Sequence, residues 1–258
     1  MASNAAVYRR RLHILESVRS RGMATVEELS ESLGVSPITI RRDLDHLSRE
    51  GSLLRRHGGA VPVEEDGSVP EKMLSEKDVL NIEAKNRIAA AAVRLLEDDG
   101  ILFMNSGSTT LCFLRALAGR RAKVITNNVA SLSVPGSPGL ELMILGGEYR
   151  EQSQSLVGEF TLSAIRNIWA DHTILGTNGL SLDRGLTTSV YQECSVNQAM
   201  IEHTHGKIIV LADSSKMGKV ANFVSSPLSK VDILVTDVDC PDPYRKDLEA
   251  LGIQVILA

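Results

Sequence analysis

The sequence predicts an α/β protein with two parts, an N-terminal winged helix-turn-helix and a C-terminal, mostly parallel α/β sheet domain. A capped helix followed by a basic, glycine-rich pair of strands ends the first sixty residues, and short apolar runs alternate with helical stretches after residue 83. Residues 1–62 carry ten Arg, no Lys and seven acidic residues, a net charge of +3, whereas the remainder carries −7. The acidic total therefore does not argue against a cationic, nucleic-acid-binding part.

The helix that follows Ser36 has the features of a DNA-reading helix. Ser36 is a good N-cap, and Pro37 suits the first helical position, where its missing N–H costs nothing. Ile40, Leu44 and Leu47 recur at spacings of four and three and predict one buried stripe. Arginines and small hydroxyls near the N-terminus suit the DNA major groove. The predicted contacts from this helix are Ser36, Pro37, Thr39, Arg41 and Arg42.

Two further helices are predicted upstream. Thr25 caps the nearer one, and Glu28 three residues later completes a capping box. Gly34 makes the tight turn into the DNA-reading helix. Residues 7–21 form the first helix, with Arg10 and Arg11 among the arginines that face outward.

A β-wing is predicted after the DNA-reading helix. Residues 52–55 and 59–61 can pair as two short strands, with a basic turn between them. Arginine at a wing tip can reach phosphate or the minor groove. The predicted wing contacts are Arg55, Arg56, His57 and Gly58.

The domain boundary is expected in a linker without periodicity. Residues 63–82 begin with an acidic triplet, a glycine and a proline, so the predicted divisions are 1–62, 63–82 and 83–258. Predicted strands cover residues 101–104, 124–126, 142–145, 173–175, 208–211, 233–235 and 255–257, and predicted helices cover 83–96, 109–118, 158–167, 190–205 and 243–251. This alternation predicts a mostly parallel sheet covered on both faces.

Five small, polar loops follow the predicted strands. In open α/β sheets, ligands bind outside the carboxyl ends of the strands. Hydroxyls, amides and glycine backbone suit a polyhydroxylated ligand, and the loop that leads into the helix at 109 favours an anion such as phosphate. Lys216 can add a point charge. The predicted effector contacts are Asn105, Ser106, Gly107, Ser108, Thr109, Thr110, Thr126, Asn127, Gly146, Gly147, Gly176, Asn178, Gly179, Asp213 and Lys216.

The pattern Val-Ser-Pro-x-Thr-Ile-Arg-Arg-Asp-Leu from residue 35, followed by Glu-Gly-x-Leu-x-Arg-x-His-Gly-Gly-Ala from residue 50, resembles the signature of the DeoR family of bacterial transcriptional regulators. The resemblance covers residues 7–61 and continues over about 83–257. It implies a repressor of sugar catabolism genes that a phosphorylated sugar or related metabolite releases from its operator. It also implies a second domain similar in fold to ribose-5-phosphate isomerase and glucosamine-6-phosphate deaminase.

The resemblance adds two effector-site residues and marks three departures. Thr187 lies in the Gly-Leu-Thr-Thr segment of the family pattern, and Glu193 matches the family's glutamate in the helix after it. Asn105 stands where the family usually has Asp, Met217 where it has Phe, and Asn197 where it commonly has a basic residue. These departures leave the identity of the sugar open.

Two other classes of function stay open. A sugar-phosphate isomerase or deaminase needs a carboxylate base beside the substrate. Where the related deaminases carry Asp and His, residues 178–180 read Asn-Gly-Leu, so the chain is predicted not to be an enzyme. The third possibility is a constitutive DNA-binding scaffold that has no ligand.

The sequence also predicts the setting of the protein. Cys112, Cys194 and Cys240 have no metal-like spacing, and we expect neither a metal nor a cofactor. No apolar run resembles a signal peptide or a membrane span, so a cytoplasmic protein without membrane contact is expected. The expected partners are a double-stranded DNA operator, a phosphorylated sugar and further copies of the chain, because one winged module makes a small interface.

Overall fold

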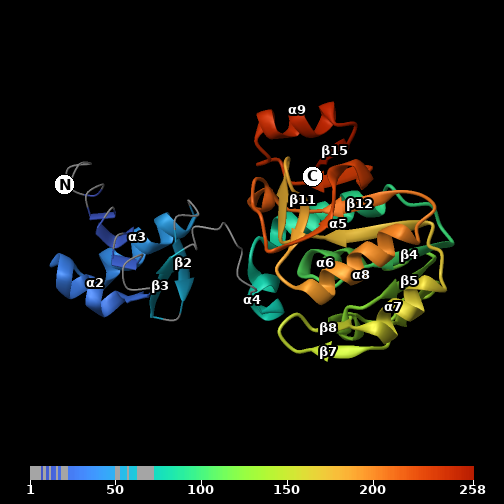
Figure 1. Ribbon diagram of the computed structural model, residues 1–258, viewed down its shortest axis with the longest axis horizontal. Helices are drawn as coiled ribbons and strands as arrows, with labels where there is room; N and C mark the ends of the chain where they lie inside the picture. The colour runs from blue at the N-terminus through green and yellow to red at the C-terminus, as the bar shows by residue number, and fades with distance from the viewer. Residues whose placement is uncertain are drawn as a thin grey trace. The chain divides into compact units, whose positions relative to one another are not determined.

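Residue contacts divide the chain, seen in a computed structural model, into two units, Met1–Ser68 and Val69–Ala258 (Figure 1). The structure describes residues 23–49, 53–56, 58–62 and 73–258, together with 7, 10, 11, 13–15, 17 and 18. At Arg49, Arg56, Pro62 and Glu76 it describes the backbone only. Each unit has its own hydrophobic core.

The first unit combines helices with a small antiparallel sheet. The described residues between 7 and 18 are helical, followed by α2 (Val26–Leu33) and α3 (Pro37–Arg49). The sheet has the order β1-β3-β2, formed by β1 (Ala24–Thr25), β3 (Gly59–Pro62) and β2 (Leu53–Arg56). The buried residues of this core include Ile14, Val18, Leu29, Ile40, Leu44, Leu47 and Leu53.

The local predictions for this unit are largely confirmed. Thr25 and Glu28 form the capping box, and Gly34 ends α2 in the left-handed conformation with a φ of 63°. The predicted stripe of α3 is buried. Strand β1 was not predicted, because two residues are too few to show a periodicity.

The second unit is built on a seven-stranded parallel sheet with the order β15-β14-β12-β9-β4-β5-β6. The strands are β4 (Gly100–Met104), β5 (Ala122–Thr126), β6 (Leu140–Ile144), β9 (His172–Gly176), β12 (Ile208–Leu211), β14 (Ile233–Thr236) and β15 (Gln254–Leu257). The chain builds outward from β4 in both directions, so the strand order reverses between β4 and β9. In such sheets the crevice at this reversal is the usual ligand site.

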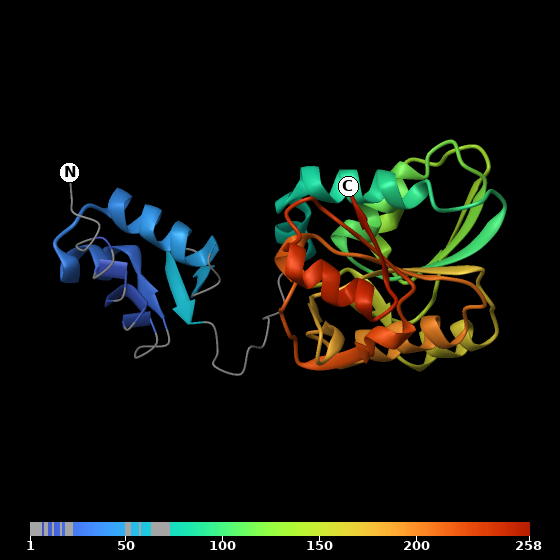
Figure 2. The same cartoon turned by 90° about the horizontal axis from the view of Figure 1, so that it is seen from above.

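Helices cover both faces of the sheet. On one face α5 (Ile82–Val93) and α6 (Ser108–Ala116) pack on apolar side chains such as Met104 and Ile174. On the other face lie α7 (Glu159–Arg166), α8 (Tyr191–Glu202) and α9 (Asp242–Ala250), against side chains such as Phe103 and Leu234. Figure 2 shows the two layers, with the teal α5 and the orange α8 on opposite sides of the strands. The predicted α/β class is confirmed.

Several smaller elements escaped prediction. A hairpin, β7 (Glu148–Arg150) and β8 (Ser155–Val157), follows the third polar loop. β10 (Gly179–Ser181) and β11 (Gly185–Thr188) follow the polar loop that begins at Gly176. They form an antiparallel sheet with β13 (Phe223–Ser226), which follows Lys216 in the chain. Helix α4 (Leu74–Val79) lies within the span predicted as a linker, because Leu74 is buried and its N–H donates to the Gln152 carbonyl. Among the described residues, no helix is long and apolar enough to cross a bilayer.

Candidate functional site

The N-terminus of α3 presents the polar groups that the sequence predicts for DNA contact. The Ser36 hydroxyl lies 3.0 Å from the Thr39 hydroxyl and accepts a hydrogen bond from the Thr39 N–H at 3.3 Å. Arg41 and Arg42 are exposed, and neither pairs with a residue that the structure describes. Pro37 occupies the first helical position and is also exposed.

Ile38 is a further exposed residue of α3 that the sequence prediction omitted. It is 62% exposed, beside Pro37 and Thr39. An apolar side chain at this end of a DNA-reading helix can contact the methyl group of thymine. Its signal in the sequence is an apolar residue outside the Ile40–Leu44–Leu47 stripe.

Arg10 and Arg11, which were predicted to face outward, instead pair with a buried carboxylate of α3. The side chain of Asp43 in α3 is buried, and its two oxygens accept from Nε of Arg10 at 2.5 Å and Nε of Arg11 at 2.9 Å. A buried carboxylate must be paired, because burying a charge alone is costly. The prediction for these two arginines was therefore wrong.

The wing is tied to α3. The Nε atom of Arg55 lies 3.2 Å from a carboxylate oxygen of Asp45 in α3. Gly58 has a φ of 77° and lies exposed in the turn. A Cβ on Gly59 would stand 2.3 Å from the Ala24 carbonyl oxygen, so only glycine fits beside β1. His57 and the Arg56 side chain lie outside the described residues.

In the second unit, the N-terminus of α6 faces a buried lysine. Lys85, in α5, is 4% exposed, and its ammonium donates to the Ser108 hydroxyl at 2.8 Å and to the Lys77 carbonyl of α4. Burial lowers the pKa of Lys85, and the charge of Asp213 opposes that shift. The hydroxyls of Ser106 and Thr109 bond to no described residue. The sequence prediction missed Lys85, because one lysine in a helix ordinarily indicates a solvated position.

Asp213 and Lys216 complete the charged end of the site. Asp213 is 2% exposed and accepts from the Ser215 N–H and from Nδ2 of Asn81, both at 3.1 Å. Burial alone would raise the pKa of Asp213, but the Lys216 ammonium and these hydrogen bonds outweigh it and lower the pKa. The charges of both Lys85 and Lys216 thus act on the Asp213 carboxylate, and the Lys85 ammonium also contacts Ser108 in the first turn of α6.

Asn105 links β4 to β9 at the reversal of the strand order. Its Nδ2 atom donates to the Gly176 carbonyl at 3.0 Å, and its Oδ1 atom accepts from the Gly176 N–H at 2.8 Å. Nδ2 also donates to Oδ1 of Asn197 in α8, at 3.0 Å. The carboxyl ends of β4 and β9 and one face of α8 therefore meet at Asn105.

A second polar cluster surrounds Glu193 in α8. One oxygen of Glu193 accepts from the Ser155 hydroxyl at 3.1 Å, and the other lies 3.5 Å from the Thr188 hydroxyl. The Thr188 hydroxyl donates to Oδ1 of Asn178 at 3.0 Å, and Nε of Arg150 lies 4.0 Å from Glu193. Ser155, Thr188 and Arg150 were not predicted, because the unpredicted strands β7, β8 and β11 carry them.

Several predicted contacts have their polar groups engaged within the protein. The buried Thr110 hydroxyl donates to the carbonyls of Asn105 and Gly107, and that of Thr187 donates to the Gly179 carbonyl and accepts from the Ala221 N–H. Thr126 accepts from the Asn128 N–H. Asn127 donates to the Leu156 carbonyl, and its Oδ1 atom is buried without a partner among the described residues.

The glycines of the third loop serve the packing of α7. The Thr161 hydroxyl donates to the Gly146 carbonyl at 2.7 Å, and a Cβ on Gly147 would stand 2.1 Å from that hydroxyl oxygen. Gly179 is equally confined, because a Cβ there would stand 2.4 Å from the Lys219 carbonyl oxygen. Packing thus explains Gly147 and Gly179, whereas Gly146 contributes only its carbonyl to Thr161. The predicted contact of these glycines with an effector stays a prediction.

Known proteins resemble the chain over nearly its whole length. It is 33% identical over 256 residues to the HTH-type transcriptional regulator GlpR of Haloferax volcanii, covering 96% of each chain. It is 33% identical to the putative aga operon transcriptional repressor of Escherichia coli O157:H7, covering 96% of this chain and 93% of the relative. The glycerol-3-phosphate regulon repressor of Escherichia coli K12 is 31% identical, over 95% and 96% of the two chains.

A solved structure of ribose 5-phosphate isomerase A from Methanocaldococcus jannaschii is 17% identical, with a TM-score of 0.39. That match spans 53% of this chain and about half, 55%, of the isomerase.

Residues 10–66 match the DeoR-like helix-turn-helix domain, and residues 80–238 match the DeoR C terminal sensor domain. The chain belongs to the DeoR family of helix-turn-helix transcriptional regulators.

Proposed function

We propose that this regulator represses genes of carbohydrate metabolism and leaves its operator when its sensor domain binds a phosphorylated sugar. The observation that carries the proposal is the buried Lys85 ammonium against Ser108 in the first turn of α6, together with the charge of Lys216, which acts on Lys85 and Asp213. Their charges and the N–H groups of that turn favour a phosphate, and the amide and carboxylate groups at Asn178 and Glu193 favour hydroxyls.

The phosphate subsite is the more sharply defined part. Lys85 has three N–H donors, of which Ser108 and the Lys77 carbonyl take two. The third donor, the free hydroxyls of Ser106 and Thr109 and the Lys216 ammonium can bind the anion together. Thr188 joins the proposed sugar subsite, because its hydroxyl lies between Asn178 and Glu193. The Thr187 hydroxyl instead bonds to the Gly179 carbonyl and the Ala221 N–H.

The names of the relatives agree with this ligand class. One relative is a repressor of a glycerol-3-phosphate regulon and another a putative repressor of an aga operon. Glycerol 3-phosphate combines a phosphate with neighbouring hydroxyls, which is the chemistry that the two subsites offer.

DNA binding is assigned to α3 and the wing. Arg41, Arg42, Thr39 and Ile38 are proposed to contact bases, whereas Arg55 pairs with Asp45 and is proposed to position the wing. Specific sites are normally read by two or more modules on repeated half-sites. The regulator is therefore proposed to act as a dimer or tetramer.

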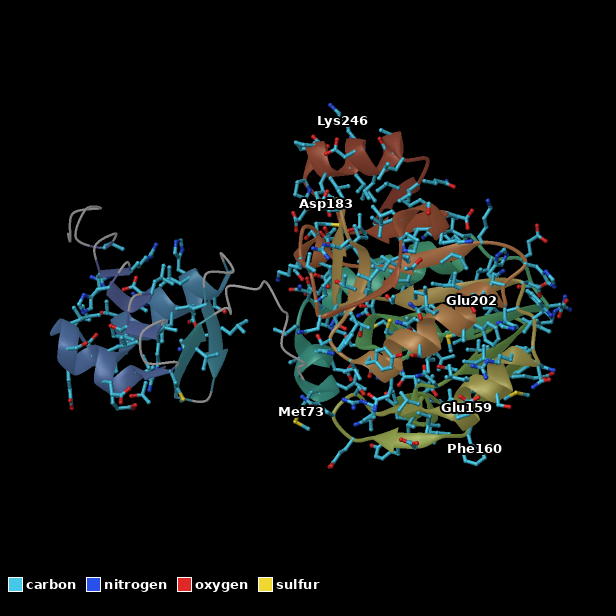
Figure 3. The ribbon with its side chains drawn as sticks, in the orientation of Figure 1. Met73, Glu159, Phe160, Asp183, Glu202 and Lys246 are labelled. Carbon is cyan, nitrogen blue, oxygen red and sulfur yellow. The ribbon has the colours of Figure 1, made fainter. Side chains whose placement is uncertain are left out.

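Self-association is assigned to the second unit, where apolar side chains are exposed. Phe160 is 82% exposed and points away from α7, beside Glu159 (Figure 3). Tyr149, in the hairpin that leads into α7, is 55% exposed. Sedimentation of Phe160→Glu beside the unaltered protein tests this surface, and an unchanged mass would reject it.

The sensor is proposed to bind its ligand without turning it over. Asn178 uses its Oδ1 atom to accept from Thr188, and an amide cannot abstract a proton. Asp213 is buried and held by Asn81 and Ser215. Incubation with ribose 5-phosphate should therefore give no product, and a steady turnover would establish the enzyme instead.

A thermal-shift screen tests the sensor directly. Inorganic phosphate, glycerol 3-phosphate, ribose 5-phosphate and glucose 6-phosphate should raise the unfolding temperature, with the sugar phosphates above inorganic phosphate. Lys216→Ala should reduce every shift. If no compound stabilises the protein, the second unit is a scaffold for oligomers and the sensor proposal fails.

A further inference from the structure

A buried pair of amides lies at the junction of β4, β9 and α8. Asn105 is 3% exposed and Asn197 is 7% exposed. The side chain of Asn105 bonds to both backbone groups of Gly176 and to Oδ1 of Asn197, at distances of 2.8–3.0 Å. Neither residue carries a charge, so this junction is held by hydrogen bonds alone.

The orientation of both amides follows from Gly176. Gly176 offers one N–H and one carbonyl to Asn105, and a side-chain amide can satisfy both in one orientation only. Asn105 then directs its second N–H toward α8, so the oxygen of Asn197, and not its NH₂ group, must accept this hydrogen bond. The NH₂ group of Asn197 is consequently directed away from Asn105, and no described residue accepts a hydrogen bond from it.

Asn197 as a whole is 7% exposed, and its Nδ2 atom is accessible rather than fully enclosed. A ligand oxygen that reaches this atom can accept its hydrogen bond. Glu193 lies four residues before Asn197, so the two side chains share one face of α8. This face therefore presents a donor and an acceptor side by side, which matches two neighbouring oxygens of a polyol.

We propose that Asn197 is a specificity-determining residue of the sensor and that Asn105 is its positioning residue; the inference rests on the proposed function. The NH₂ group of Asn197 donates to a hydroxyl or carbonyl oxygen of the phosphorylated ligand, and Glu193 accepts from a neighbouring hydroxyl. Inorganic phosphate, which occupies only the charged end near α6, makes neither contact. The effector is thus a phosphorylated polyol or sugar whose unphosphorylated end bears vicinal oxygens.

Exchanging single atoms tests this assignment. Asn197→Asp keeps an oxygen for Asn105 but replaces the NH₂ donor by an acceptor. Asn105→Asp removes the N–H that donates to Asn197 and puts an acceptor in its place. The Asn197 amide should then turn its NH₂ group toward residue 105 and present its oxygen to the ligand. Both substitutions should weaken binding of the tightest sugar phosphate at least about tenfold. Both should leave the affinity for inorganic phosphate within about twofold.

Two further variants separate this role from general damage. Asn197→Ser removes the donor without adding charge and should cause a similar loss. Asn167→Asp makes the same amide-to-acid change at the exposed C-cap residue of α7, where the amide donates only to the Ser163 carbonyl, and should change neither affinity. Circular dichroism and the unfolding temperature report whether each full-length variant folds.

The measurement is titration calorimetry with inorganic phosphate, glycerol 3-phosphate, ribose 5-phosphate and glucose 6-phosphate. Loss of the sugar-dependent part of the affinity in the three variants, with phosphate binding retained, supports the assignment. Unchanged sugar-phosphate affinity in folded Asn197→Asp and Asn197→Ser overturns it while the sensor stands. If the unaltered protein binds none of the four compounds, both the sensor proposal and this inference fall.

Discussion

Lys85 places a positive charge inside the second unit, where water cannot stabilise it. The carboxylate of Asp213 and two hydrogen bonds compensate in part, and burial still lowers the pKa of Lys85. A bound phosphate would supply the missing negative charge. The chemistry of this single residue therefore sets the pH range in which the proposed sensor works.

Effector affinity should fall at a lower alkaline pH than it would if Lys85 had the ordinary pKa of lysine. Affinity should first rise near pH 6, as the phosphate takes its second charge. It should fall again as Lys85 loses its proton, below the usual pKa of lysine. Lys85→Arg keeps the charge and should move this fall to higher pH. Calorimetry at a series of pH values checks this, and identical profiles for the two proteins would contradict it.

The same shift has a consequence for the protein without ligand. At pH values between the lowered pKa of folded Lys85 and the ordinary pKa of lysine, Lys85 is protonated in the unfolded chain but has lost its proton in the folded protein. In that window the contribution of Lys85 makes the free energy of unfolding rise with pH. Lys85→Met should remove this contribution.

Arg42 belongs to the DNA half of the mechanism. Arg42→Ala should weaken specific operator binding by about 1–3 kcal/mol if the guanidinium contacts a base. Arg94→Ala, at the exposed C-cap residue of α5, removes the same charge from the other unit and should have little effect. Gel shifts at fixed salt measure both, and equal affinities for the two variants would reject the role of Arg42.

Sequence patterns locate the residues of the polar loops better than Lys85, which lies within a helix. The turn before α6 and the Asp213–Lys216 segment have recognisable compositions, and the structure places Asp213, Lys216 and Lys85 near one another. Lys85 could not be found because its burial depends on α4 and α6, which lie on either side of it in the chain. Arg10 and Arg11 were assigned outward for the same reason, since their partner Asp43 is more than thirty residues away.

At the scale of elements, α3 is held in two ways. Its apolar stripe is buried, and Asp43 pairs with Arg10 and Arg11 on the first helix. Asp45, on the exposed side, pairs with Arg55 of the wing. The two acidic residues thus fix α3 to its neighbours on both sides while Arg41 and Arg42 stay available.

Asp43→Ala should lower the local stability of α3 by about 2–4 kcal/mol, because two arginines lose a buried partner. Asp45→Ala removes an exposed ion pair and should cost less than about 1 kcal/mol. Hydrogen exchange of the α3 amides in the full-length protein measures both. Equal exchange rates in the two variants would show that burial of the Asp43 pair has no special effect.

Long, regular elements were predictable, and short ones were not. The seven parallel strands are four or five residues long, and each carries consecutive apolar residues that stand out in the sequence. The hairpin β7–β8 and the sheet β10-β11-β13 consist of strands with three or four residues, too short to show alternation. Their register depends on pairing between distant segments, such as β11 with β13. Ser155, Thr188 and Arg150 were missed with them.

At the scale of the whole molecule, charge and chemistry are divided between two units. The first carries the cationic reading helix and wing, and the second carries the acidic bulk and the two lysines near α6. Lys85 also contacts the carbonyl of Lys77 in α4, near the N-terminal end of the second unit. A ligand can shift the regulator between DNA-bound and free states only by its different affinity for them.

Release of operator DNA by a sugar phosphate tests the central claim most directly. Fluorescence anisotropy of a labelled operator would follow the titration for the unaltered protein and for Lys85→Met. We predict that the sugar phosphate releases DNA from the unaltered protein, whereas Lys85→Met binds the operator equally well and needs at least about tenfold more ligand for release. Release at the same ligand concentration from both proteins, or from neither, would contradict a phosphate sensor at Lys85.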